Sequence, residues 1–437
     1  MKGLGVILVL CFICANVQSA DKDPFDDLDH PKAPSNNKDP FDDLDIKKDV
    51  KAAAQQKPAV AQVPIKDESW LHELFHENFA FKKEVFSQFT YSTDHARENS
   101  DESTYSRQSA GFEVQKKFST QNSTVASFDF QGRFVRRDNF NPVVNDMEGM
   151  TREGWFFEIH NAYWDFYNVL NPVMDDKARG DNLGRFNFRI GRFYLPFGLN
   201  LQTDTHGTVL QLSNDRNFGS ERDWYAGLWG SVNADIDYDF FYLLGSGYNF
   251  SFKGQSGMLG TRFNLSNKYL NEYGLEGGIS FMGGQRISKD AVERSPSVAA
   301  HSHNDVVDTL RVGLDWRYTR QVPSGSVTFT NEISAGEDET DRVFTQLEEI
   351  GYLNKSRKWG LNTQYRRFWQ NIRGLDTGKD PSTHRSDASI FGEATWYFRN
   401  DIGNTNLHWI KFNVEQQLEV QKGKPDRIYT IQYYRYW

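Results

Sequence analysis

Hydrophobic and polar residues alternate along most of the chain after about residue 78. In one such segment, Leu310, Val312 and Leu314 share one face, and Arg311 and Asp315 share the other. Successive side chains on a β-strand point to opposite faces, so each segment has an apolar face and a polar face. An even number of such strands is typical of single-chain transmembrane barrels, whose apolar face meets lipid and whose polar face lines the lumen. The pattern predicts sixteen strands, over residues 78–92, 106–119, 124–138, 153–169, 184–197, 224–233, 235–246, 257–267, 273–285, 306–320, 325–336, 342–353, 358–370, 387–399, 406–420 and 426–437.

A soluble β-sandwich would show the same alternation, and the lengths of the connections separate the two architectures. Connections after even-numbered strands are mostly short, as at 321–324, although 171–183 is an exception. Connections after odd-numbered strands are mostly long, apart from the short last ones near Glu337 and Gly423; the long ones are 93–105, 139–152, 198–223, 247–256, 286–305 and 371–386. Outer-membrane barrels alternate short periplasmic turns with long external loops. We therefore predict an all-β fold, a transmembrane antiparallel barrel over residues 70–437 with its long loops facing outward.

The segment from Arg185 to Asp223 combines a cationic strand with a long polar loop. Arg185 and Arg189 lie on one face of the strand, opposite the apolar face that carries Ile190. The strand ends at Pro196-Phe197-Gly198, and the loop that follows carries Arg216, Glu221 and Arg222 toward its far end. A loop of this length can fold back into a barrel lumen. We therefore predict that this segment forms the narrowest point of a pore.

Composition is compatible with a membrane barrel. The mean hydropathy is −0.67, and no run of about 18 apolar residues follows the N-terminus, so no spanning helix is expected. Low hydropathy does not exclude a barrel, because lumen-facing and lipid-facing residues cancel in any window. The aromatic fraction of 15% suits the girdles that barrels place at both membrane interfaces. The formal charge of −9 gives no sign of a nucleic-acid partner.

The N-terminal residues read as an export signal followed by a tail. Residues 1–20 carry one lysine, an apolar core and small residues at the end, which is the pattern of a signal peptide. Both cysteines lie inside this segment, so the mature chain is expected to have no disulfide. Residues 21–69 contain the octapeptide KDPFDDLD twice, at Lys22–Asp29 and Lys38–Asp45. This polar tract has too few apolar residues to fold, so we predict a disordered acidic periplasmic tail, whose repeat is either a spacer or a docking motif for a periplasmic partner.

A short motif before the first strand matches a zinc-protease signature. His72-Glu73-Leu74-Phe75-His76 reads H-E-x-x-H, which on a helix places two imidazoles on one face for zinc. A third ligand would also be needed, and the sequence passes directly into alternating strands. A structural plug segment is therefore the favoured interpretation. His301 and His303 lie in a polar connection and are expected to be solvated. No spacing of Ser and His marks a nucleophile and base, so we expect no catalysis, no metal and no cofactor.

The chain ends in an aromatic strand, from Tyr429 to Trp437. A final strand with a C-terminal aromatic residue resembles the assembly signal of outer-membrane proteins, and we assign Tyr433 and Trp437 to it. Arg435 departs from the apolar residue usual two places before the end. The signal implies recognition by the barrel assembly machinery of a Gram-negative outer membrane.

A local motif also resembles a known family. The segment Arg189-Ile-Gly-Arg-Phe-Tyr-Leu-Pro-Phe-Gly198, followed by Glu221-Arg222 and a glycine-rich strand, is similar to the phosphate-selective porin O and P family. The resemblance implies a sixteen-stranded barrel, a homotrimer and an inward-folded constriction loop. Together with the cationic strand and the polar loop described above, it assigns the constriction and its selectivity to Arg185, Arg189, Arg192, Arg216, Glu221 and Arg222.

The predicted lumen carries charges of both signs. Rings of one sign set ion selectivity in a pore, whereas here arginines and acids are mixed. We expect inward charges at Arg133, Arg262, Arg311, Arg317, Asp235, Asp237 and Asp239. An anion preference, including phosphate, and a weakly selective channel therefore both stay open. The favoured function is passive diffusion of small solutes across the outer membrane, and the alternative is a non-channel scaffold or adhesion protein that acts through its tail or external loops.

Overall fold

The computed structural model describes residues 78–93, 104–119, 124–138, 154–170, 186–199, 213–218, 221–247, 250, 254–287, 306–339, 341–371, 384–401, 406–419 and 425–437. The predicted signal peptide, the acidic tail and the HELFH motif lie outside these residues, as do Arg185, His301 and His303. Among the described residues, no helix is long and apolar enough to cross a membrane.

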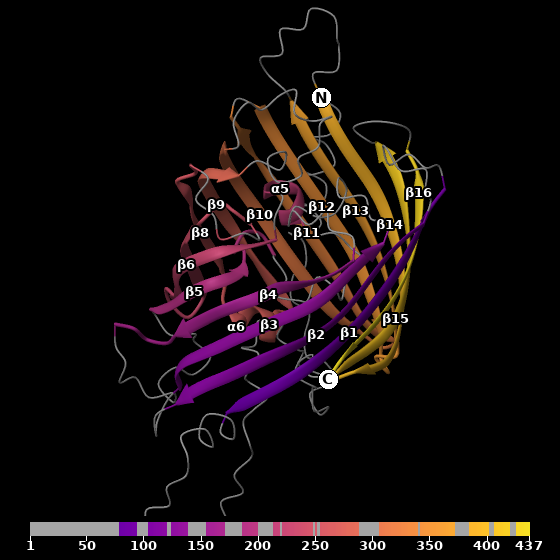
Figure 1. The fold of residues 1–437 in the computed structure, drawn as a ribbon, viewed down its shortest axis with the longest axis horizontal. Coiled ribbons are helices and arrows are strands. Elements are labelled where there is room, and N and C mark those ends of the chain that lie inside the picture. The colour runs from indigo at the N-terminus through magenta and orange to yellow at the C-terminus, as the bar shows by residue number, and fades with distance from the viewer. Residues whose placement is uncertain are drawn as a thin grey trace, which may run out of the picture. The chain divides into compact units, whose positions relative to one another are not determined.

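Sixteen antiparallel strands form one closed barrel, as the sequence pattern predicts (Figure 1). Each strand pairs with its neighbours in the chain, and β1 pairs with β16 to close the sheet. Closure leaves no sheet edge whose backbone groups lack partners, which is a requirement for strands in lipid. The strands are β1 (Phe79–Ser92), β2 (Thr104–Ser119), β3 (Thr124–Asp138), β4 (Gly154–Phe166), β5 (Asn187–Tyr194), β6 (Arg222–Ser231), β7 (Ile236–Leu243), β8 (Gly257–Leu265), β9 (Leu275–Ile287), β10 (Val306–Val322), β11 (Gly325–Asp338), β12 (Asp341–Asn354), β13 (Trp359–Asn371), β14 (His384–Asn400), β15 (Leu407–Glu419) and β16 (Arg427–Tyr436).

The last residues of the chain complete the barrel closure. The backbone N–H of Trp437 donates to the carbonyl oxygen of Lys83 at 3.1 Å, and that of Lys83 donates to Trp437 at 2.8 Å. Tyr433 lies on the outward face of β16, because Tyr434 and Tyr436 are buried on the inward one, and Trp437, directly after the strand, is exposed. The guanidinium of Arg435 lies 4.5 Å from the Trp437 ring centroid, so this outward arginine stacks on an aromatic residue at the strand end.

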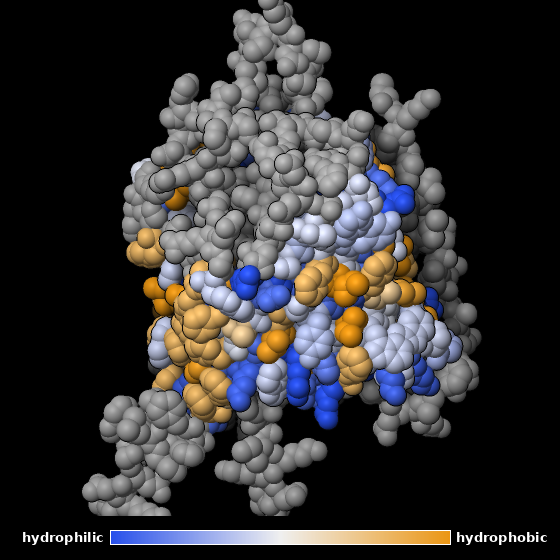
Figure 2. All heavy atoms as spheres, turned by 45° about the vertical axis from the view of Figure 1, so that its right-hand side comes forward, coloured by the Kyte–Doolittle hydropathy of each residue, from blue (hydrophilic) through white to orange (hydrophobic). Residues whose placement is uncertain are grey.

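The two faces of each strand differ as the alternation predicts. On β10, Leu310 is 56% exposed, whereas Arg311 and Asp315 are buried. Figure 2 shows apolar side chains across the outer surface of the barrel, with hydrophilic ones above and below many of them. The inner surface therefore carries most of the buried polar and charged groups.

The barrel has a low wall built from short strands and a high wall built from long strands. Strands β5 to β8 have 8, 10, 8 and 9 residues, whereas β10 to β14 have 17, 14, 14, 13 and 17. Figure 1 shows the short strands on one side and the long ones opposite. The barrel wall is thus lower around the strand that carries the predicted constriction loop.

The described parts of the connections contain two short helices. Helix α6 (Asn267–Tyr273) joins β8 to β9 and ends at Gly274, whose φ of 66° is left-handed. A Cβ there would lie 2.1 Å from the carbonyl oxygen of Thr319, so the turn requires glycine. Helix α5 (Ser213–Phe218) belongs to the connection between β5 and β6.

Candidate pore constriction

The chain turns into the barrel where β5 ends. The ring of Phe197 packs on Gly313 of β10, where an added Cβ would lie 2.7 Å from a ring carbon. The backbone N–H of Gly198 donates to Ser280 Oγ of β9 at 3.1 Å. Because β9 and β10 are not neighbours of β5, these contacts carry the chain across the interior. We call the described parts of this connection, residues 195–199 and 213–218, the inward segment.

Helix α5 fixes the far part of the inward segment to the high wall. Asn217 Oδ1 accepts hydrogen bonds from Ser334 Oγ at 2.5 Å and Thr345 Oγ1 at 2.9 Å. Its backbone oxygen accepts from Arg311 Nη2 at 3.3 Å. Asn214 Nδ2 donates to the carbonyl oxygen of Phe197 at 2.8 Å, which ties the two parts together. The inward segment therefore reaches from β5 to β10, β11 and β12.

One side of the inward segment is filled by apolar side chains. Phe197 and Phe218 meet edge to face at 5.0 Å between centroids. Around them, Leu195 of the inward segment and residues of β4 to β9 form a buried cluster; the strand residues are Tyr163, Phe193, Tyr194, Tyr225, Phe241, Leu243, Met258 and Met282. Close-packed apolar groups leave little room for water. We call this buried cluster on the inner face of β4 to β9 the apolar sector.

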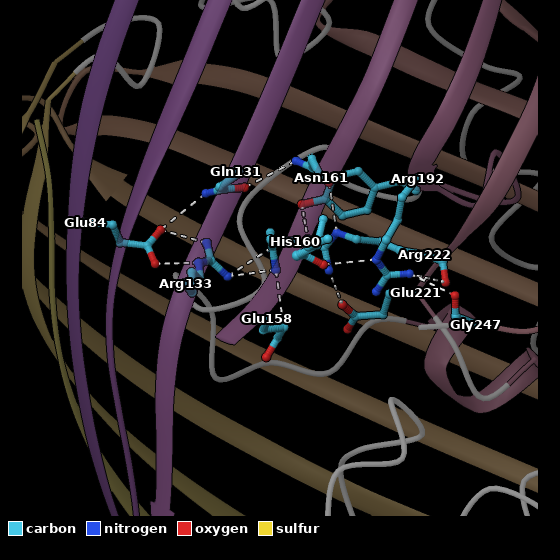
Figure 3. A network of polar contacts seen from close by, with 12 residues as sticks. Glu84, Gln131, Arg133, Glu158, His160, Asn161, Arg192, Glu221, Arg222 and Gly247 are labelled. Carbon is cyan, nitrogen blue, oxygen red and sulfur yellow. Dashed lines mark hydrogen bonds and ion pairs between the residues drawn. The ribbon is translucent and has the colours of Figure 1, made fainter. Parts of the chain in front are cut away.

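The other side carries a network of polar side chains (Figure 3). Glu84 of β1 accepts from Arg133 Nη2 of β3 at 2.7 Å, and its other oxygen lies 2.5 Å from Arg133 Nε. Arg133 Nη1 lies 2.9 Å from Nδ1 of His160, and Glu158 lies 3.6 Å from the same nitrogen. Gln131 continues the row by donating to Glu84 at 3.4 Å. We call the inner face of β13 to β16 and β1 to β3, together with Glu158 and His160 of β4, the polar sector. It also holds a second buried apolar cluster, of Phe86, Leu407, Trp409, Tyr434 and Tyr436.

Arg192, Glu221 and Arg222 meet beside this network at the entrance to the inward segment (Figure 3). Arg222 Nε donates to Asn161 Oδ1 at 3.2 Å, and its Nη1 donates to Glu221 at 3.3 Å. Arg192 donates to the carbonyl oxygens of Ile159 at 3.0 Å and Gly247 at 2.9 Å. These guanidinium groups thus brace the strand ends at the low wall.

Arg189 is held by an acid that the sequence did not single out. Its Nε and Nη2 donate to the two carboxylate oxygens of Asp165 on β4, each at 2.7 Å. Its guanidinium lies 3.8 Å from the Phe193 ring centroid and 4.7 Å from that of Tyr163. A bidentate, stacked arginine is fixed in place and is largely neutralised.

Other lumen arginines are neutralised in the same way. Arg262 of β8 makes a bidentate pair with Asp315 of β10, at 2.5 and 2.7 Å. Arg311 Nη2 lies 2.8 Å from Asp338, and Arg317 pairs with Glu276. Two further pairs in the polar sector are Lys411 with Glu393 at 3.3 Å and Arg366 with Glu415 at 3.5 Å.

Three predicted lumen acids differ in their placement. Asp237 is buried on β7 and accepts from Ser231 Oγ at 2.6 Å, and Asp239 is half-buried on the same face. Asp235 lies in the turn before β7 and not on the strand, so its assignment to the lumen wall is wrong. There it accepts from Lys268 of α6 at 3.1 Å, and this hydrogen bond raises the pKa of the Lys268 ammonium.

The remaining two predicted constriction residues, Arg185 and Arg216, have no described side chain. Arg216 belongs to α5, but its side chain lies outside the described part of the structure, as does the whole of Arg185.

Three residues of the site, Asn217, Phe197 and His160, were not predicted as site residues from the sequence. A neutral amide in a loop, or a single ring, gives no pattern from which the sequence alone would predict a position inside a barrel. Among the described residues, no three His, Cys, Asp or Glu side chains are grouped so that they would hold a metal ion.

Comparison with known proteins bears on the fold. No protein-family model matches the chain, and no curated protein matches it. The high-pH structure of Pseudomonas putida OprB matches with a TM-score of 0.54 at 9% identity, over 82% of this chain and 94% of that one. The outer membrane channel DcaP of Acinetobacter baumannii matches with a TM-score of 0.50 at 8% identity, over 82% and 97%. The chain therefore has the barrel fold of outer-membrane porins.

Proposed function

We propose that this protein is a porin of a Gram-negative outer membrane, through which small hydrophilic solutes diffuse passively. The observation that carries the proposal is the inward segment, which crosses a closed barrel and leaves a polar sector on one side. An amphipathic barrel with a polar interior is the architecture of water-filled outer-membrane channels. The similarity to an outer membrane channel supports the same assignment. The proposed activity includes no catalytic step.

The charge arrangement favours weak ion selectivity. The phosphate-selective porin resemblance implies an anion preference at the constriction, which the sequence assigns to Arg185, Arg189, Arg192, Arg216, Glu221 and Arg222. However, Arg189, Arg262 and Arg317 each make an ion pair with a lumen acid. A neutralised guanidinium attracts a passing anion less than a bare one does. We therefore propose a channel that passes both ion signs, with anions such as phosphate among its solutes.

The proposed setting adds partners to the channel. The export signal, outer-membrane lipid and the barrel assembly machinery follow from the N-terminal sequence and from the aromatic end at Tyr433 and Trp437. A homotrimer follows from the family resemblance. Residues 21–69 would extend into the periplasm and offer KDPFDDLD to a partner there, and their removal should leave conductance intact.

Planar-bilayer recording of the purified full-length protein tests the proposal. We expect stepwise, ohmic currents in potassium chloride, and a small reversal potential in a salt gradient. A protein that inserts but never conducts, with or without residues 21–69, would contradict channel function. A large anion-selective reversal potential would instead support the phosphate-selective alternative.

A further inference from the structure

A polar patch interrupts the outer, apolar face of the barrel on β11 to β13. Thr345 and Leu347 of β12 are buried, and Thr345 contacts the inward segment, so this face points inward. Gln346 and Glu348 alternate with them and therefore point outward. Gln346 Nε2 donates to Glu348 Oε1 at 2.6 Å. Glu348 shares its exposed face with Ile350, which is 56% exposed.

Strand register extends the patch to both neighbouring strands. Asn331 of β11 lies directly opposite Glu348, and Arg367 of β13 lies opposite Gln346. Arg367 is 39% exposed and lies 3.6 Å from Glu419. Directly opposed residues on one face of a sheet are within contact distance. We define the polar patch as Asn331, Gln346, Glu348 and Arg367.

The polar patch lies between two rows of aromatic side chains. Tyr352 and Trp359 pack together at 5.2 Å on one side of it. Phe344 and Trp369 are opposed on the other side. Glu348 is four residues from both Phe344 and Tyr352 along the same outward face, and thus midway between the rows. Barrels place such aromatic girdles at the two membrane interfaces, so Glu348 lies in the middle of the apolar band.

The same band is apolar on neighbouring strands. On β10 the outward residues at these positions are Leu310, Val312, Leu314 and Trp316, which are all exposed. A charged or amide side chain at mid-band is unfavourable against hydrocarbon. The polar patch is therefore a poor surface for lipid and a suitable one for a protein neighbour.

We infer that the polar patch is an in-membrane contact surface for a second copy of this chain. The inference rests on the proposed outer-membrane insertion and specifies one face of the proposed oligomer. The patch holds amide donors, a guanidinium and a carboxylate side by side, so one copy offers what another needs. A second copy also inserts in the same orientation, which brings an identical patch to the same depth.

The oligomeric state of lipid-free and reconstituted protein tests the inference. We expect Gln346→Leu with Glu348→Leu to convert the oligomer to a monomer, as measured by light scattering. Ser87→Leu on the outward face of β1 is the matched control and should leave the oligomer intact. A double variant with an unchanged oligomer would overturn the inference, and so would a wild-type protein that is already monomeric.

Chemical crosslinking provides a second, independent readout. The mature chain is expected to contain no cysteine, so Ile350→Cys places a single thiol beside the patch. A short bismaleimide should link two copies through this site and should not do so for Ile190→Cys on β5. Crosslinking of Ile190→Cys and not of Ile350→Cys would overturn the inference, although the protein would still be an oligomer. Conductance of the same preparations reports on channel function separately, because loss of current at an unchanged oligomeric state would count only against the channel.

Discussion

The apolar sector and the polar sector differ although both line the inside of one barrel. In the apolar sector, short strands carry Phe241, Leu243 and Met258 inward, and the inward segment packs on them. In the polar sector, the inner wall carries Glu84, Arg133 and their neighbours, which are buried and bonded to one another. The first therefore provides an apolar packing surface for the inward segment, and we propose that the second forms the polar wall of the passage.

We propose that this difference builds the constriction of the channel without a separate domain. The inward segment is held by apolar contacts at Phe197 and by polar contacts at Asn217, one at each end. Its position is thus set by packing of Phe197 on β10 and on the apolar sector, and by hydrogen bonds from β10, β11 and β12 to Asn217. Solutes would pass only on the side where the wall stays polar.

The largest expected effect comes from removing the Phe197 ring that packs against the apolar sector. Phe197→Ala removes a buried ring, which should lower the free energy of unfolding by about 3 kcal/mol and leave the inward segment loose. Single-channel conductance should rise, because the constriction widens. Bilayer recording and denaturant unfolding measure the two effects.

A matched pair of glycine substitutions tests the same packing contact from the side of β10. Gly313→Ala places a methyl group against the Phe197 ring and should also increase conductance. Gly392→Ala is the control, because an added Cβ there meets nothing within 4 Å. Equal behaviour of the two variants would contradict the packing of Phe197 on β10.

The next effect concerns a lumen ion pair. Asp315→Ala leaves Arg262 buried without its bidentate partner, which should cost about 3 kcal/mol of stability. Lys268→Ala removes an exposed pair with Asp235 and should leave the midpoint of denaturant unfolding unchanged. A similar midpoint for both variants would show that the lumen pair is solvated and not structural.

Selectivity should respond differently in the two sectors. Glu84→Gln removes a carboxylate from the polar sector, so the permeability ratio should move toward anions, by about twofold. Asp165→Asn removes one from beside the apolar sector and should change the ratio less. Reversal potentials in a potassium chloride gradient measure the permeability ratio of each variant. A larger shift for Asp165→Asn would contradict the proposal that solutes pass along the polar sector.

The smallest effect is expected at the polar end of the inward segment. Thr345→Val removes one of two hydroxyl donors to Asn217 while it keeps the side-chain volume, and should cost about 1 kcal/mol. Conductance should change little, because Ser334 still donates to the same oxygen. A conductance increase as large as that of Phe197→Ala would show that the hydrogen bonds, and not the packing, hold the segment.

Much of the fold could be predicted from period-two alternation, because one face of each strand meets an apolar surrounding and the other does not. All sixteen strands are confirmed, with ends that differ by a few residues. Asp235 was misplaced because a polar residue at a strand end satisfies the alternation equally well in a turn. Arg192 could not be oriented, because Gly191, with a φ of 134°, interrupts the regular strand just before it.

The partners of the lumen charges could not be predicted, for a different reason. Arg189 meets Asp165 only because the register of β4 and β5 places the two directly opposite each other. Arg262 meets Asp315 across an intervening strand, β9. Such pairings depend on closure and register, which the alternation of a single strand does not encode.

Thiol accessibility from the lumen tests most directly whether the passage lies along the polar sector. The probes are Gln88→Cys on β1 and Asn362→Cys on β13, both half-buried, and Met258→Cys in the apolar sector, which is 2% exposed. A charged methanethiosulfonate reagent added during bilayer recording should reduce the current through the first two variants and leave the third unchanged. Block at Met258→Cys without block at Gln88→Cys or Asn362→Cys would contradict the account.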